Sequence, residues 1–466
     1  MRVDSSASDI AHLALQPEFL GAFALKEHFE GLSMSSRNLL LAVFSLLLMP
    51  VPALADASAA GVINSGDTAW MLTSTALVLI MTPGLAFFYA GMVRTKNVVS
   101  TLYQNFIALG VIGVLWAIIG YSLAFSSGIP LIGDLSFSML NGVGQAPVDG
   151  NATIPHLLFM IFQMMFAIIT PALMTGAFAE RVRFKAWLMI LILWSLIVYS
   201  PVAHWLWVPT GWLAAMGALD FAGGFVVHMT AGCSALVAAI LFGKRRDFGQ
   251  PAKPHDVGMI VLGTALLWFG WFGFNAGSAL TSGGLATQAF VNTFLAAAVA
   301  MLAWTAIDTL KDGKPTTMGG CIGVVAGLVA VTPAAGFVTT STALVIGLLA
   351  GVVCNLVARL VKTKFKLDDT LDVFACHGVG GAIGVTMTGL LATTAVNSAG
   401  ADGLLLGSSK LFIANLTGVV AVAAYSMICT FVIIKVVSMV TALRVTDSEE
   451  NDGLDSTQHG ELISSH

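Results

Sequence analysis

The feature that most constrains this fold is a series of long apolar segments that fills almost the whole chain after residue 66. A transmembrane helix needs about 20 mostly apolar residues, and inside a bilayer only helices or closed barrels satisfy the backbone. Charged residues make up only 10% of this chain, against about 25% in average soluble proteins. We therefore predict an all-α, polytopic membrane protein with eleven transmembrane helices. Their approximate limits are 69–92, 99–125, 154–178, 186–205, 223–242, 257–279, 288–309, 317–335, 340–361, 373–393 and 407–440.

The charges of the connecting loops predict the orientation of the chain. Alternate loops contain Lys and Arg, whereas the loops between them (126–153, 206–222, 280–287, 336–339 and 394–406) contain neither. Cytoplasmic loops of membrane proteins carry an excess of these two residues. The basic loops are therefore expected in the cytoplasm, with the mature N-terminus outside and the C-terminal tail, 443–466, inside. A bacterial cytoplasmic (inner) membrane is the expected location.

The N-terminal residues have the pattern of a secretory signal peptide. Residues 34–55 combine a basic start, the ten-residue apolar run Leu39–Leu48 and a small-residue site that ends at Ala55, as signal peptides do. We expect cleavage after Ala55, and we interpret residues 1–33 as a misassigned gene start. The alternative is a genuine cytoplasmic extension with Leu39–Pro52 retained as an anchor. The membrane domain then covers residues 56–442.

Two histidines, His228 and His377, lie inside otherwise apolar spans. An ionisable residue at bilayer depth is costly unless it faces the protein interior or a watery path. A single such histidine could equally be a packed core residue with a hydrogen-bond partner. Both, however, lie in the fifth span of a five-span half, and each follows a Leu-Asp pair that ends at Asp220 or Asp372. The two halves would have opposite topology, as in the inverted repeats of transporters, with one extra helix. The paired histidines therefore indicate a pathway for a proton or a small polar solute.

Several long motifs make the chain similar to a known family. From residue 66 to about 461 the sequence resembles the Amt/Mep/Rh ammonium transporters, and the bacterial Amt branch in particular. The matching stretches are GDTAW at 66–70, TPGLAFFYAGMVRTKN at 82–97, GAFAERVRF at 176–184, ALDFAGGFVVH at 218–228, GWFGFNAGS at 270–278, AGLVAVTP at 326–333, DTLDVFACHG at 369–378, and LRV, GLD and HGE at 443–445, 453–455 and 459–461. The resemblance implies the ammonium transporter fold, transport of ammonium or methylammonium for nitrogen uptake, a homotrimer, and regulation by a PII signalling protein of the GlnK type.

The chemistry of ammonium explains what such a path requires. Ammonium has nearly the size and charge of potassium, so a pore cannot separate the two by radius alone. Ammonium can lose a proton, and a dry path lowers the pKa of an amine because it penalises the charged form. A selective path therefore needs a mouth that attracts cations, where aromatic faces contribute about 0.5–2 kcal/mol each. A narrow apolar section that only the neutral amine crosses should follow, with a separate route for the proton.

The resemblance implies which residues build this path. Trp207, Ser278 and Phe166 match the external ammonium site, and His228 and His377 match the twin histidines of the pore. An aromatic gate is expected from Phe162, Phe166 and Phe274. One departure leaves an alternative open, because the loop after Trp207 is one residue longer than the usual pattern, so that Trp205 could face the site instead.

Other polar residues are expected to have structural roles. Asp220 begins a span, where an aspartate can cap free backbone N–H groups, and the resemblance implies that it also supports the external site. Asp372 is expected to be a similar cap at the cytoplasmic end, with no part in the transport chemistry. We place His204 at the surface or in an interface, and we expect Glu180 and Arg181 to form an ion-paired turn.

Other classes of function are less compatible with the sequence. We find no nucleophile elbow, no phosphate-binding loop and no carboxylate or metal-ligand cluster, so neither an enzyme nor a cofactor is predicted. An ammonium sensor of the same fold is the main alternative. Sensor versions usually carry a fused signalling domain, whereas the tail here has about 25 residues. The Amt-type tail and the signal peptide also favour the Amt branch over the Rh branch. The tail is expected to dock on the cytoplasmic face.

Overall fold

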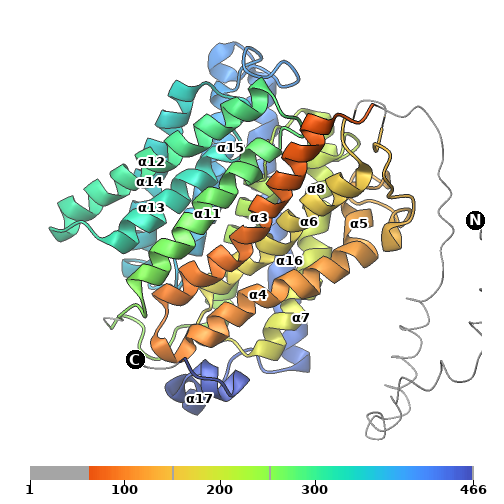
Figure 1. Cartoon of the computed structure of the whole chain (residues 1–466). Helices are drawn as coiled ribbons and strands as arrows, with labels where there is room; N and C mark the ends of the chain where they lie inside the picture. Colours follow the sequence, from red (N-terminus) through yellow and green to blue (C-terminus); the bar gives the residue numbers. More distant parts are fainter. Residues whose placement is uncertain (1–61, 150–151, 251–252, 464–466) are drawn as a thin grey trace, which may run out of the picture. The chain divides into compact units, whose positions relative to one another are not determined.

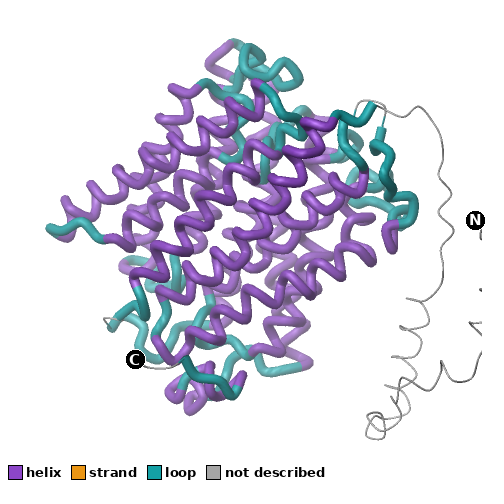
Figure 2. The backbone as a smooth tube through the Cα atoms, in the orientation of Figure 1, coloured by secondary structure: helices purple, strands orange, loops and turns teal. Residues whose placement is uncertain are grey.

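The computed structural model of the chain describes residues 62–149, 152–250 and 253–463. The predicted extension at 1–33 and the signal peptide at 34–55 lie outside these residues. Throughout the described part the secondary structure is helical, without a β-strand longer than an isolated bridge. The tube in Figure 2 shows helices running side by side, with loops gathered at the two ends of the bundle. The predicted all-α membrane architecture is confirmed.

The helices follow the apolar segments of the sequence closely. In chain order the α-helices are α3 (Ser65–Met92), α4 (Val98–Leu115), α5 (Tyr121–Phe125), α6 (His156–Leu173), α7 (Phe184–Trp194), α8 (Ser200–Trp207), α9 (Trp212–Met216), α10 (Thr230–Phe242), α11 (Val257–Gly277), α12 (Gly284–Asp312), α13 (Thr317–Val331), α14 (Thr340–Thr363), α15 (Gly380–Leu391), α16 (Ser409–Val440) and α17 (Asp447–Asp452). Short π-helical segments are η3 (Trp116–Gly120), η6 (Ser195–Tyr199), η7 (Gly224–Met229), η8 (Phe374–Val379) and η10 (Asp455–His459). Short 3₁₀ turns are η2 (Thr95–Asn97), η4 (Ser138–Leu140), η5 (Met174–Ala177) and η9 (Leu404–Leu406).

The exact number of eleven spanning helices is not confirmed. Over the described residues, ten helical stretches are long and apolar enough to cross a membrane. The predicted span at 317–335 corresponds to α13, which has 15 residues and falls below that length. Pro333 has no N–H with which to continue the helical hydrogen bonds, and α13 ends at Val331, one residue before a Thr332 that still has helical backbone. The residues that follow, up to 337, form turns.

Small residues allow the helices to approach one another closely. α3 and α11 pack along most of their length, and they lie side by side in Figure 1. At Gly263 of α11 an added Cβ would lie 2.3 Å from the backbone nitrogen of Phe88 in α3. Small residues at such interfaces are typical of membrane bundles. This close packing brings the inner faces of α3, α6 and α11 toward the two segments that carry the histidines.

The loops rich in Lys and Arg gather at one end of the bundle, which we call the basic end. α16 ends at the basic end, and the residues after it pack against this end as α17 and η10 (Figure 1). A short antiparallel bridge joins Arg444 to Val182, and its hydrogen bonds link Arg183 to Leu443 and Val445 to Arg181. The C-terminal residues are therefore an ordered part of the fold up to residue 463.

Candidate functional site

A cavity of about 130 Å³ opens at the end of the bundle opposite the basic end. Its wall is mostly aromatic, and polar atoms come from Gln163 and Ser278. The lining residues are Phe125, Phe159, Gln163, Phe166, Trp207, Phe221, Ser278 and Leu280. The buried Oε1 atom of Gln163 has no hydrogen-bond partner among the described residues, so it remains an acceptor for a guest. Aromatic faces with one or two free acceptors suit a small cation that carries N–H groups.

Trp207 lines this cavity, whereas Trp205 does not. The indole N–H of Trp207 donates to the carbonyl oxygen of Asp220 at 3.1 Å, which fixes the ring beside the cavity. Trp205 donates instead to the carbonyl oxygen of Leu131 at 2.8 Å and packs against Tyr425 with ring centroids 4.7 Å apart. Of the two tryptophans that the sequence left as alternatives, the structure places Trp207 at the cavity.

Two phenylalanines separate this cavity from the interior. The rings of Phe166 and Phe274 lie with their centroids 4.3 Å apart. Phe162 touches Phe166 at 5.0 Å but lines neither this cavity nor the one beneath it. It packs instead beside the backbone of Gly277. The structure thus forms the constriction from Phe166 and Phe274, with Phe162 behind them.

The two histidines meet on the inner side of this constriction. Their Nδ1 atoms are 3.3 Å apart, and both side chains are buried. The imidazole of His228 stacks against both Trp271 and Phe274, with ring centroids 5.5 and 5.9 Å away, and these two rings also contact each other. The space around the pair is only about 10 Å³ and is otherwise apolar. Its lining residues are Met81, Leu85, Phe88, Ile169, Leu173, Val227, His228, Leu267, Trp271, Phe274, Val325 and His377.

Each histidine segment begins at an aspartate eight residues earlier in the chain. The carboxylate of Asp220 accepts four backbone N–H groups, those of Gly223, Gly224, Phe225 and Val226. In the other half, Asp369 accepts the N–H groups of Val373 and Phe374. Both segments continue as π-helix through the histidine. Asp369, rather than Asp372, is therefore the counterpart of Asp220.

Our expectation that Asp372 is the cap was wrong. The match between the Leu-Asp pairs selects Asp372, but only Asp369 shares the eight-residue spacing to its histidine. The backbone of Asp372 has a positive φ of 60°, and its side chain pairs with Lys362 instead. Burial, followed by the negative charge of Asp372, raises the pKa of Asp369 to about 6.

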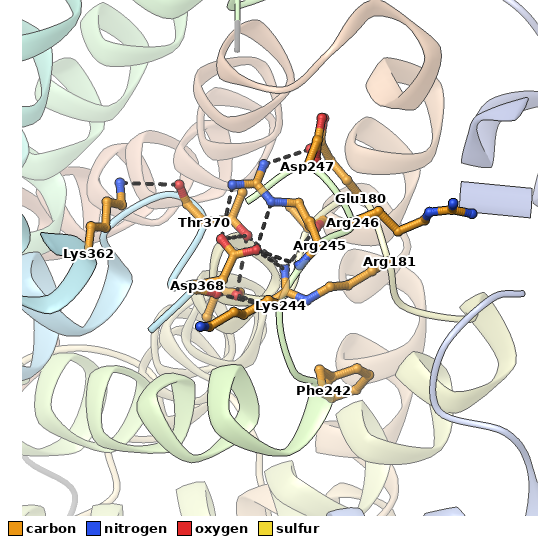
Figure 3. Close-up of polar contacts among 12 residues, drawn as sticks. Glu180, Arg181, Phe242, Lys244, Arg245, Arg246, Asp247, Lys362, Asp368 and Thr370 are labelled. Carbon is orange, nitrogen blue, oxygen red and sulfur yellow. Dashed lines mark hydrogen bonds and ion pairs between the residues drawn. The ribbon is translucent and has the colours of Figure 1, made fainter. Parts of the chain in front are cut away.

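The basic end contains a buried ionic network centred on Glu180 (Figure 3). Glu180 accepts hydrogen bonds from Arg94 and Asn97 and pairs with Arg245 at 2.7 Å. Arg245 also pairs with Asp368 at 2.9 Å, four residues before Asp372. Burial raises the pKa of Glu180, but the hydrogen bonds from Arg94 and the charges of Arg245 and Arg94 outweigh it and lower that pKa to about 2.

Glu180 and Arg181 are both ion-paired, as the sequence predicts for this turn, but not with each other, because Arg181 lies 4.0 Å from the carboxylate of Asp368. The guanidinium of Arg181 is fully buried and donates to the carbonyl oxygens of Ala177, Ala179 and Asp368. The backbone of Glu180 has a positive φ of 69°, and the two neighbouring side chains have different partners. Arg181 thus ties the loop after α6 to the loop that precedes His377.

His204 is buried, not at the surface as the sequence suggested. Its Nδ1 atom lies 3.1 Å from the carbonyl oxygen of Ala124. It lines neither the outer cavity nor the histidine cavity. The apolar sequence around His204 does not indicate that α5 packs over the face of α8 that carries this histidine.

The tail is attached to the basic end through many polar contacts. The side chain of Lys96 donates to the carbonyl oxygens of Glu450 and Asn451, and the N–H of Arg246 donates to the Glu450 carboxylate. Asp455 accepts the N–H of Ser100 at the start of α4. Basic loops thus meet acidic tail residues, including the ion pairs Arg183–Glu449 and Arg246–Asp447, and the tail is docked on the basic end.

Sequence reasoning missed part of the outer cavity. Phe159, Gln163 and Phe166 follow the i, i+4, i+7 spacing of one helix face. From this spacing, Phe159 and Gln163 could have been predicted beside Phe166 at the cavity, in place of Phe162. Phe125, Phe221 and Leu280 come from three separate segments. Nothing in the local sequence indicates that these three meet.

Comparisons with known proteins agree with this architecture. The profile of the Ammonium Transporter Family matches residues 69–463. The ammonium transporter of Bacillus subtilis is 50% identical over 396 residues, which cover 85% of this chain and 98% of that protein. Candida albicans Mep2 superposes with a TM-score of 0.78 at 39% identity, covering 83% of this chain and 88% of its own. A structure described as a sensor Amt protein has a TM-score of 0.77 at 29% identity, with 84% and 98% covered.

Proposed function

The chain belongs to the Ammonium Transporter Family, and we propose that it carries ammonium along the cavities that run past Trp207, Phe166 and the two histidines. One observation carries the proposal. Two imidazoles face each other at 3.3 Å in a nearly filled apolar space, directly inside an aromatic cavity that is suited to a cation.

The outer cavity would recruit the cation. The faces of Trp207 and the neighbouring phenylalanines attract ammonium without binding it as tightly as a carboxylate would. The hydroxyl of Ser278 donates to the carbonyl oxygen of Phe274 at 2.8 Å, so its lone pairs are directed to accept an N–H. The free Oε1 of Gln163 offers a second acceptor. Asp220 would act indirectly, because its carbonyl oxygen holds the Trp207 ring.

The proton and the amine would separate at the constriction. Loss of water around the Phe166–Phe274 pair penalises the charged form of the amine, so ammonia crosses as the neutral molecule. The two histidines can each offer a donor or an acceptor to a passing amine, and the Nδ1–Nδ1 contact lets them share one proton. A separate proton transfer along this pair would complete the net movement of ammonium.

We further propose the cellular setting that the sequence implies. The basic end would face the cytoplasm of a bacterial inner membrane, and the signal peptide at residues 34–55 would be removed after Ala55. Three copies would form a homotrimer with one path per subunit. A PII protein of the GlnK type would then bind at the cytoplasmic end, next to the docked tail. Intact-mass measurement of the mature chain tests the processing, since retained residues 1–33 would contradict it.

The decisive experiment measures currents and methylammonium flux in proteoliposomes. His228→Ala and His377→Ala should reduce ammonium transport or loosen its selectivity. His228→Asp and His377→Glu should admit potassium wherever a current survives, because a carboxylate places a negative charge in the path. His204→Ala is the matched control, since it also removes a buried imidazole but lines neither cavity. Wild-type flux and potassium exclusion in both alanine variants would refute the proposed role.

A further inference from the structure

A second polar cavity, of about 260 Å³, lies at the basic end between α12, α13 and α14. It shares no lining residue with the histidine cavity, but two of its lining residues lie near that cavity's residues in the sequence. Ile322 is one helical turn before Val325 on α13, and Asp372 is five residues before His377. Because α13 begins at the basic end, Ile322 lies on the basic-end side of Val325. On the proposed path, this cavity would be the exit at the basic end.

Two of the three carboxylates in this cavity share a single guanidinium. Asp308 and Asp312 both pair with the guanidinium of Arg359. Asp308 also accepts the side-chain N–H of Asn355 at 2.8 Å. Asp312 has a bidentate pair with Arg359, whereas Asp308 accepts one hydrogen bond from it, so both carboxylates already have a cationic partner. The remaining acidic residue of the wall is Asp372.

The two oxygens of Asp372 have different surroundings. Oδ2 accepts a hydrogen bond from the Lys362 ammonium at 2.7 Å, while Oδ1 is buried and has no partner among the described residues. A buried oxygen without a partner costs about 1–3 kcal/mol. The backbone of Asp372 is also in the left-handed region, at φ 60°, which for a residue other than glycine costs about 1 kcal/mol or more. Because Asp372 has both an unpaired buried oxygen and an unfavourable backbone conformation, we expect it to have a role other than stabilising the fold.

The role of Asp372 can be inferred from its partner, Lys362. Its side chain ends in a primary ammonium, the same chemical group as ammonium and methylammonium. It lies in the last turn of α14, is about one-third exposed, and also approaches the carbonyl oxygen of Thr370 at 3.5 Å (Figure 3). The chain thus holds an ammonium group of its own on the carboxylate at the end of the path.

We infer that Asp372 is a cation-binding position at the exit, and that Lys362 is a specificity residue that occupies it as a tethered competitor. This inference rests on the proposed function. With Lys362 in place, the pair carries no net charge, so a leaving ammonium or a cytoplasmic potassium ion is not retained. Without Lys362, the carboxylate and its free Oδ1 would hold such a cation and obstruct the exit.

The test compares inhibition from the two sides of the membrane. Full-length protein is reconstituted in liposomes, its orientation is determined from protease protection of the tail, and initial methylammonium uptake is measured with potassium inside or outside. Lys362→Met should lower the internal potassium concentration for half-inhibition at least tenfold, and external potassium should act as on wild type. Lys362→Arg should behave as wild type, and the Lys362→Met, Asp372→Asn double variant should lose the added inhibition.

A chemical version of the test separates charge from folding. Lys362→Cys is prepared with Cys429→Ser, because the other four cysteines are buried. Aminoethyl methanethiosulfonate restores an ammonium at position 362 and should remove the potassium inhibition, whereas the neutral methyl reagent should not. Equal inhibition with both reagents, or an unchanged half-inhibition value in Lys362→Met, would overturn the inference. Absence of methylammonium uptake in the wild type would instead contradict the proposed function.

Discussion

Replacing Gly232 with alanine tests the backbone contact that holds the two histidine segments together. An added Cβ at Gly232 would lie 1.9 Å from the backbone nitrogen of Gly378, next to His377. The segments would have to separate by about 1.5 Å to reach ordinary van der Waals contact at 3.4 Å. Overpacking a core typically costs about 1–3 kcal/mol, and the upper part of that range applies because backbone cannot rotate away. The 3.3 Å contact between the histidines should be lost with it.

The assay combines stability with transport. Thermal unfolding in detergent, followed by tryptophan fluorescence, should show the midpoint of Gly232→Ala lowered by several degrees, and proteoliposomes should show reduced methylammonium flux. Gly378→Ala should be milder, because its Cβ would meet the ring of Phe374 at 2.8 Å and a side chain can move. Gly110→Ala is the control, since nothing lies within 4 Å of its added Cβ. Wild-type stability and flux in Gly232→Ala would refute the argument.

Two further predictions concern buried carboxylates. The folded-state pKa of Glu180 is lowered from 4.5 to about 2. Its contribution to stability is therefore complete above pH 4.5 and is lost as pH falls toward 2, a total of about 3 kcal/mol. Glu180→Gln should make the unfolding midpoint less dependent on pH in this acid range, and an unchanged pH profile would contradict the assignment. Asp220→Ala removes the acceptor for four N–H groups and should cost about 2 kcal/mol or more in denaturant or thermal unfolding. Asp256→Ala, an exposed cap with two N–H groups, should cost less, and equal losses would contradict the prediction.

Much of the fold could be predicted from the sequence because a membrane span is a local property. Length and apolarity placed α3, α11 and α16 within a few residues of their observed limits. The shortened α13 shows where this reasoning stops. Its end depends on Pro333 and on turns that are buried by neighbouring helices, so hydropathy alone extended it to 335. A buried turn and a buried helix are equally apolar.

The candidate site was less predictable because its residues meet through tertiary structure. His228 and His377 could be paired from the symmetry of the two halves. The correct aspartate in the second half, Asp369, needed the spacing to the histidine rather than the identity of the preceding residue. Phe125 and Phe221 could not be found at all, since their positions depend on how α5 and the segment before η7 pack around Trp207.

The sizes of the three cavities suggest how the path would exclude potassium. About 130 Å³ at the outer end and about 260 Å³ at the basic end have room for water, whereas the histidine space of about 10 Å³ is close to the minimum for one water-sized molecule. A potassium ion there would lose nearly all of its hydration shell, and the bare cost of burying a charge is tens of kcal/mol in an apolar medium. Two imidazole nitrogens cannot replace that shell. Ammonia, which is neutral and about as large as water, needs only one donor or acceptor, and the pair His228 and His377 provides both. On the proposed path, selectivity therefore comes from a dry step of one molecule's length rather than from a binding site that recognises ammonium more strongly than potassium.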